Sequence, residues 1–293
     1  MGSAPKPLFR SPSGRARYRA SYDAALRLWK VPFSERDVPT TFGATHVIVA
    51  GESGARPVVL LHSAQASSTM WFPNIEALAS ARRAYAIDFP LEVGKSELER
   101  AIRTRSDLAS WFLEVLDMLR LDVVDVVGIS RGAWNAVALA LQIPERIGRL
   151  VLLSPAQTFM PITNIGFLLA TLRCSLLPSA RALRSLCAIA FHEPRRIPDL
   201  FLEQYALGLR SFNLANGIYL PPAVFSDDEL RTLRTPVLLM IGEFDIVNTH
   251  TAIDRAEALV PRIQTETVAG AGHILSIDRA EFVNARITEY LSA

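Results

Sequence analysis

Cysteine is scarce in this 293-residue chain, which has only Cys174 and Cys187. Two cysteines make neither a disulfide framework nor a metal-binding set. No uninterrupted apolar run approaches the roughly 18 residues that a membrane-spanning helix needs. We therefore predict a soluble, cytoplasmic protein without a membrane span. No His-Glu-x-x-His motif and no complete glycine-rich nucleotide-binding motif occurs, so we predict neither a metal ion nor a cofactor.

Net charge is also small, at +2, which argues against a nucleic-acid partner. The charge is unevenly placed, because the side chains before the first acid, Asp23, are all basic or neutral. Residues 1–18 are rich in Ser, Pro and Arg and lack the apolar segment of a secretory signal. We therefore expect a flexible or loosely docked basic arm over residues 1–18.

Short apolar runs alternate with segments of helical apolar spacing along the rest of the chain. The predicted strands cover 38–50 (a hairpin), 57–61, 84–87, 123–129, 149–153, 236–242 and 265–268. The predicted helices cover 18–29, 74–81, 107–119, 253–259 and 279–291, with Asp107 as a candidate N-cap. This alternation is typical of a doubly wound, mostly parallel α/β sheet.

The alternation is interrupted between residues 157 and 225. This stretch has helical apolar spacing and no convincing strand. We predict a helical lid over the carboxyl ends of the strands, where α/β proteins bind their ligands. The core would then comprise residues 19–156 and 226–293. The arginines of the lid, which we interpret as a solvated face, could also attract an acidic partner: Arg173, Arg181, Arg184, Arg195 and Arg196.

The sequence Gly128-Ile129-Ser130-Arg131-Gly132 joins a predicted strand to a predicted helix. A tight strand-to-helix turn leaves little room for side chains, so small residues flank a projecting serine. Gly-x-Ser-x-Gly in this context predicts a nucleophile elbow with Ser130 as the nucleophile.

A serine hydroxyl needs an adjacent base, which a third group holds in place. Asp245 follows the strand at 236–242, and His273 follows the last strand in a glycine-rich loop. The order serine, acid, histidine at three strand ends predicts a catalytic triad. Glu243 is the competing acid. We expect Asp88 to order a neighbouring loop and His62 to brace loops.

These segments, with Val58-Val59-Leu60-Leu61-His62 and Gly270-Ala271-Gly272-His273, resemble the α/β-hydrolase superfamily, in particular its lid-containing serine esterases. The resemblance covers roughly residues 40–293 without the lid. It implies an oxyanion hole made by two backbone N–H groups, those of Arg131 and Ala64.

The chain departs from the family at Ser63, where a glycine usually follows the histidine. Since glycine adopts backbone conformations that cost serine about 1 kcal/mol or more, the loop could take a different path. Alternatively, Ser63 and Gln65 could place polar side chains in the pocket. Met70, Trp71 and Trp134 are further candidate pocket residues, with packing favoured for Trp134.

We predict a serine hydrolase that cleaves a small-molecule carboxylic ester or related acyl substrate through an acyl-enzyme. Two alternatives stay open. One is a tailoring enzyme of the same fold: a thioesterase, acyltransferase, C–C hydrolase or lyase. The other is a non-catalytic ligand receptor. The sequence leaves the oligomeric state open.

Overall fold

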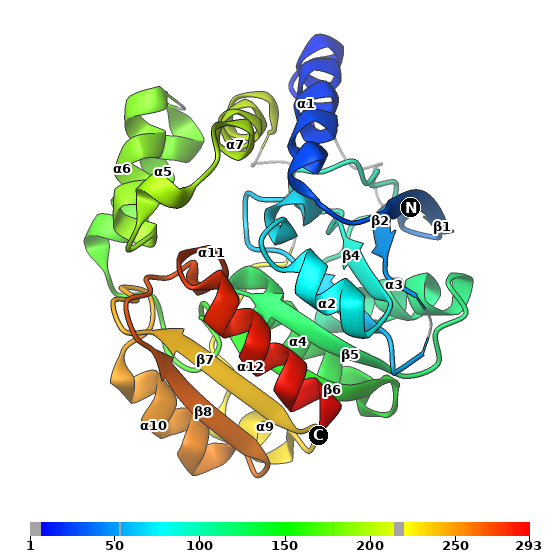
Figure 1. The fold of residues 1–293 in the computed structure, drawn as a ribbon, viewed down its shortest axis with the longest axis vertical. Coiled ribbons are helices and arrows are strands. Elements are labelled where there is room, and N and C mark those ends of the chain that lie inside the picture. The colour runs from blue at the N-terminus through cyan, green and yellow to red at the C-terminus, as the bar shows by residue number, and fades with distance from the viewer. Residues whose placement is uncertain (1–6, 53, 178, 214–219) are drawn as a thin grey trace.

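An eight-stranded sheet runs through the protein in the order β1-β2-β4-β3-β5-β6-β7-β8 (Figure 1). The computed structural model describes residues 7–52, 54–177, 179–213 and 220–293. The strands are β1 (Phe33–Thr40), β2 (Gly43–Ala50), β3 (Val58–Leu61), β4 (Ala84–Ile87), β5 (Val124–Ile129), β6 (Ile147–Leu153), β7 (Val237–Gly242) and β8 (Ile263–Val268). The β1–β2 hairpin is antiparallel and joins β4 antiparallel, whereas all later neighbours pair in parallel.

The central strands are buried on both faces, as their continuous apolar sequences predict. Every residue of β3, β5 and β7 is buried. The charged exception is Asp125 of β5, which pairs with buried Arg82 at 3.0 Å and with half-exposed Arg56 at 3.2 Å.

Helices cover both faces of the sheet. They are α2 (Ile75–Ala81), α3 (Arg105–Met118), α4 (Arg131–Gln142), α9 (Asp227–Thr232), α10 (His250–Leu259), α11 (Leu275–Asp278) and α12 (Ala280–Ser292). Val59 and Leu61 of β3 pack in one apolar core with α3, α4, α9 and α10, while Val58 and Leu60 pack in the other with α2, α11 and α12. The predicted doubly wound, mostly parallel sheet is therefore confirmed.

The N-terminal segment differs from the prediction. Helix α1 spans Pro12–Ala25, and a 3-10 turn follows at Leu26–Leu28. Ser11 caps α1 by accepting a hydrogen bond from the N–H of Gly14 at 3.0 Å, and proline stands in the first turn. Tyr18 is fully buried in this helix. The prediction of a loose arm is thus wrong for residues 12–18, while residues 1–6 lie outside the described part of the chain.

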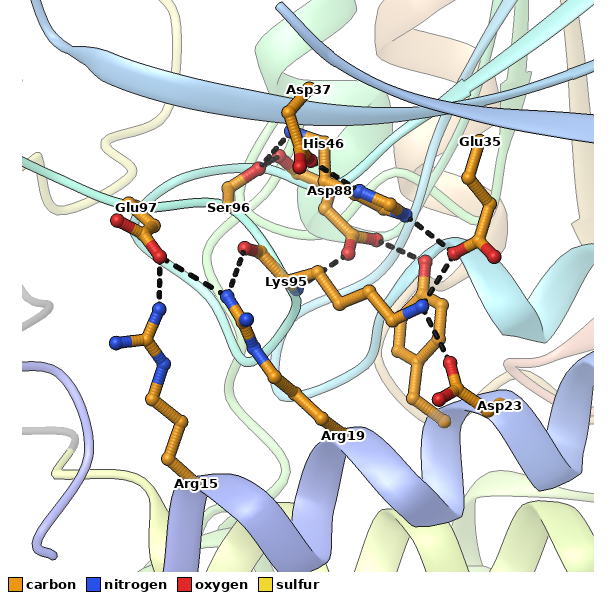
Figure 2. A network of polar contacts seen from close by, with 11 residues as sticks. Arg15, Arg19, Asp23, Glu35, Asp37, His46, Asp88, Lys95, Ser96 and Glu97 are labelled. Atoms are coloured by element: carbon orange, nitrogen blue, oxygen red, sulfur yellow. Dashed lines mark hydrogen bonds and ion pairs between the residues drawn. The ribbon is translucent and has the colours of Figure 1, made fainter. Parts of the chain in front are cut away.

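The basic residues of α1 are used to dock it (Figure 2). Arg15 and Arg19 both pair with Glu97, in the loop after β4. Lys95 of that loop reaches back to Asp23 of α1 at 2.6 Å. These exposed pairs are individually weak, but they act together with the buried tyrosines of the helix.

One helix boundary also differs. Thr104, rather than Asp107, is the N-cap of α3. Asp107 lies one turn inside and completes a capping box, in which each side chain accepts a hydrogen bond from the other residue's N–H at 3.0 Å.

Between β6 and α9, the described residues form the helices α5 (Ile165–Leu176), α6 (Ala180–Ala190) and α7 (Asp199–Ser211), with a 3-10 turn at Pro194–Arg196. We call residues 157–225 the helical insertion; the helices described in it lie at one end of the sheet (Figure 1). Helix α7 is fixed there by buried Gln204. Its amide donates to the Tyr18 hydroxyl at 3.2 Å and to Ser67 Oγ at 3.0 Å, and it accepts from Thr69 at 2.7 Å.

Candidate functional site

Ser130 lies at the sharp turn between β5 and α4. Its backbone has φ 52° and ψ −113°, which is unusual for a residue with a side chain and costs about 1–3 kcal/mol. The two flanking glycines are required by contact. A Cβ at Gly132 would lie 2.1 Å from the carbonyl oxygen of Leu61, and one at Gly128 would lie 2.5 Å from that of Gly132.

Three side chains from three loops form a hydrogen-bonded series at this turn. Ser130 Oγ lies 2.9 Å from His273 Nε2, and His273 Nδ1 lies 3.0 Å from Asp245 Oδ1. Because a carboxylate can only accept, Nδ1 carries the proton, and Nε2 accepts from the serine hydroxyl. All three residues are buried, with His273 only 2% exposed. The structure thus brings together the three residues that the sequence pattern selected.

Asp245 is held in place by its own loop. Its carboxylate accepts hydrogen bonds from the N–H of Val247 at 2.8 Å and from the side-chain amide of Asn248 at 2.8 Å. Burial opposes its ionisation, but His273 and these donors together lower the pKa of Asp245 below its usual value. The carboxylate is therefore charged at neutral pH and stabilises a positive charge on the imidazole.

The loop carrying His273 is fixed by Asp278, a fully buried residue that the sequence prediction missed. Its carboxylate accepts from the N–H groups of Gly272 at 2.9 Å, His192 at 2.8 Å and Glu193 at 3.0 Å. Two of these donors belong to the helical insertion, so Asp278 joins the insertion to the histidine loop. An aspartate inside a helical apolar pattern carries no signal of this role.

The rival acidic residues brace loops instead. Glu243 accepts from the N–H of Gly270 at 2.9 Å. Asp88 accepts from the N–H groups of Ser68 and Lys95, both at 2.8 Å, and so orders the neighbouring loops as expected.

The loop after β3 follows a path set by His62 and Gln65. His62 Nε2 accepts from the N–H of Phe89 at 2.9 Å, while Nδ1 lies 2.8 Å from the Ser63 carbonyl, which confirms its bracing role. The left-handed residue of this loop is Gln65, with φ 59°, and Ser63 is not among the described residues with positive φ. Serine at position 63 is therefore not strained in the way that the missing glycine suggested.

Ala64 and Arg131, the predicted oxyanion donors, both line the cavity beside Ser130. In the described part of the chain, neither backbone N–H has an acceptor. For Arg131 this follows from its place as the first residue of α4, where an N–H has no intrahelical partner. Both groups are thus free to bind an anionic oxygen.

The cavity has a volume of about 640 Å³ and reaches from Ser130 and His273 to the helices of the insertion. Its wall is mostly apolar and includes Phe167, Leu168, Leu172, Leu176, Leu186, Phe191, Phe201, Leu202 and Tyr205. Of the predicted pocket residues, Ser63, Gln65 and Met70 line it. The sulfur of Met70 also accepts from the N–H of Ser63 at 3.3 Å.

The two predicted pocket tryptophans do not line this cavity. Trp71 is fully buried in the core on the α2 face of the sheet. Trp134 stacks on Phe225 with ring centroids 5.4 Å apart, and its indole N–H donates to the Ala223 carbonyl at 2.9 Å. Their large apolar rings fill the two cores beside the elbow instead.

Glu92 is a cavity residue that the sequence prediction missed. Its carboxylate accepts from the N–H of Gln65 at 2.8 Å and so holds the left-handed residue in place. Burial raises the pKa of Glu92, an effect that its bond to Gln65 and the nearby charge of Arg131 reduce. The sequence around Glu92 carries no motif that marks this role.

Among the described residues, no group of three or more His, Cys, Asp or Glu side chains is arranged to hold a metal ion. None of the described helices is long and apolar enough to cross a membrane.

Comparisons with known proteins agree with this geometry. The model of the alpha/beta hydrolase family matches residues 58–286. The uncharacterized carboxylesterase nap of Bacillus subtilis (strain 168) is 35% identical over 94% of this chain and 93% of its own length. Carboxylesterase YbfK of the same strain is 36% identical over the same shares, 94% and 93%. The crystal structure of naproxen esterase from Bacillus subtilis superposes with a TM-score of 0.89 at 34% identity, covering 96% of this chain and 99% of that one.

Proposed function

The chain belongs to the α/β-hydrolase family, and we propose that it is a serine esterase that hydrolyses an uncharged carboxylic ester through an acyl-enzyme intermediate. The observation that carries this proposal is the hydrogen-bonded series from Ser130 through His273 to Asp245. The carboxylesterases among its relatives support the same activity.

In the proposed reaction, His273 Nε2 takes the hydroxyl proton as Ser130 Oγ attacks the ester carbonyl carbon. The C–O bond to the alcohol then breaks, and the imidazolium gives its proton to the departing alkoxide. A water molecule then gives a proton to the same Nε2 and attacks the acyl carbon. The bond from that carbon to Ser130 Oγ breaks, the imidazolium returns its proton to Oγ, and the acid is released. Asp245 holds the imidazole through Nδ1 and stabilises its cation throughout.

We assign the oxyanion hole to the free N–H groups of Ala64 and Arg131. Each such donor typically contributes about 10²–10³ in rate, because it is aimed at charge that develops only in the transition state. Glu92 supports the hole by holding Gln65, the residue after Ala64.

The apolar wall of the cavity favours a substrate with a substantial uncharged hydrocarbon or aromatic part. We propose that the helical insertion acts as the lid, because its residues make up more than half of those that line the cavity. The cytoplasmic location, the lack of a nucleic-acid partner and the lack of a cofactor remain predictions from the sequence.

Labelling with a serine-directed fluorophosphonate, together with hydrolysis of p-nitrophenyl esters, tests the proposal. The native protein should label and turn over esters, and Ser130→Ala should do neither. Absence of labelling would favour a receptor on this scaffold. Labelling without ester turnover, but with turnover of thioesters or β-diketones, would favour the tailoring enzymes.

A further inference from the structure

Helix α5 exposes an apolar face to solvent. Six of the ten large exposed hydrophobic side chains in the described part of the protein lie on this helix or just after it. They are Ile165 (71% exposed), Leu168 (44%), Leu169 (60%), Leu172 (52%), Leu176 (66%) and Leu177 (71%). Exposed apolar residues of soluble proteins are normally scattered, so a cluster of this size marks an interaction surface.

The cluster follows helical geometry. Residues 165, 168, 169, 172 and 176 recur at spacings of three and four, which places them along one side of α5. The only buried residue of α5 is Cys174. The apolar side of α5 is therefore largely exposed. We call these five residues and Leu177 the α5 face.

The segment that carries α5 and α6 has basic charge only. The sequence has no Asp or Glu between Phe159 and His192. Three arginines, Arg173, Arg181 and Arg184, are exposed in this stretch and make no ion pair among those found in the described residues. Arg173 lies on α5, and Arg181 and Arg184 lie on α6, which packs against it. An apolar helix face accompanied by unpaired arginines is the pattern of helices that lie in the interface of an anionic lipid layer.

The charge pattern argues against a second copy of the chain as the occupant. Two α5 faces packed together would bring six arginines close to one another with no nearby acid of either hairpin. An anionic lipid headgroup layer instead supplies the missing negative charge while the leucines enter the acyl region.

The α5 face also continues into the candidate active site. Leu168, Leu172 and Leu176 are exposed, and they line the cavity as well. Ser175 of the same helix accepts a hydrogen bond from the Gln65 amide at 2.9 Å, next to the predicted oxyanion donor. In Figure 1, α5 and α6 lie away from α1, whereas α7 lies beside it.

We propose that the protein docks through the α5 face on anionic lipid surfaces, with the arginines contacting headgroups and the cavity mouth held at the lipid. The docking is independent of the proposed ester hydrolysis. The two together would give the enzyme access to apolar esters dissolved in the lipid.

Sedimentation with vesicles tests the docking. The native protein should bind vesicles of phosphatidylcholine and phosphatidylglycerol, bind pure phosphatidylcholine vesicles more weakly, and be released by salt. The double variant Ile165→Gln/Leu169→Gln should bind these vesicles with an affinity lowered about tenfold or more, because two apolar side chains no longer enter the lipid. Neither residue lines the cavity, so hydrolysis of a water-soluble ester should stay unchanged. The matched control, Met118→Gln/Phe282→Gln, alters exposed residues elsewhere and should bind like the native protein.

A second variant, Arg173→Gln/Arg184→Gln, should lose the preference for phosphatidylglycerol and most of the salt dependence. The proposal is overturned if the native protein does not bind either vesicle, or if the glutamine variant at 165 and 169 binds equally well. It is also overturned if the native protein is a dimer that the Ile165→Gln/Leu169→Gln variant dissociates. Failure of the ester assay would refute the proposed function alone, because sedimentation does not depend on turnover.

Discussion

Replacing Ser63 by glycine, the residue usual in the family, should destabilise the protein and leave catalysis unchanged. Ser63 is not in the left-handed region, so glycine relieves no strain there and adds freedom to the unfolded chain. That freedom costs about 0.5–1 kcal/mol. The substitution also removes the 3.2 Å hydrogen bond from Ser63 Oγ to the Ala64 carbonyl, for about 0.5 kcal/mol more. The free energy of unfolding should therefore fall by about 1–1.5 kcal/mol.

Position 65 should behave in the opposite way. Gln65 has φ 59°, where an L-residue pays about 1–2 kcal/mol that glycine does not. Both Gln65→Ala and Gln65→Gly lose the side-chain bond to Ser175, so their difference isolates the backbone term. Gln65→Gly should be more stable than Gln65→Ala by about 1 kcal/mol.

Urea denaturation measures these stabilities. The kcat for a soluble p-nitrophenyl ester shows whether the oxyanion donors keep their positions. Displacement of one oxyanion donor would lower kcat by about 10²–10³, so Ser63→Gly should stay within a few-fold of the native enzyme. The reasoning is refuted if Ser63→Gly stabilises the protein or raises kcat tenfold. Equal stability of the two Gln65 variants would refute it as well.

Three further outcomes follow from the buried charges. Asp245→Asn should lower kcat for ester hydrolysis by about 10⁴-fold, because the amide no longer fixes the imidazole tautomer, and a loss below about tenfold in steady-state assays would contradict the assigned role. Arg82→Met should cost about 3–5 kcal/mol in urea denaturation, since it leaves the buried carboxylate of Asp125 with a half-exposed partner only; the double variant Arg82→Met/Asp125→Leu should recover much of this loss. Because the native pKa of Asp245 is lowered, its stabilisation is present above the unfolded value of about 3.9 and is lost as pH falls through the lower native value. Urea titrations from neutral to acid pH should show this loss, and Asp245→Asn should remove that component.

The sheet and the elbow could be predicted from the sequence because their signals are local. Buried parallel strands are short and continuously apolar, and Gly-x-Ser-x-Gly records a steric requirement within five residues. The partners of Ser130 could be predicted because parallel strands end at the same edge, which brings Asp245 and His273 together whatever the loops between them do.

The features that were missed depend on contacts between distant segments. The burial of Tyr18 depends on α7, and the roles of Glu92 and Asp278 depend on backbone N–H groups of other loops. Trp71 lies near the oxyanion loop in sequence, but its packing direction, which a single sequence does not reveal, places it in the core.

The docking of α1 has a consequence for the order of folding. Arg10 donates to the carbonyl of Phe212, a separation of 202 residues. During synthesis α1 leaves the ribosome long before α7, which has to follow before it can receive α1. Tyr18 and its neighbours would stay exposed during that interval, and closure of this long loop would be among the last steps of folding. Nascent chains that end before α7 therefore expose the apolar side of α1, which makes them open to chaperones.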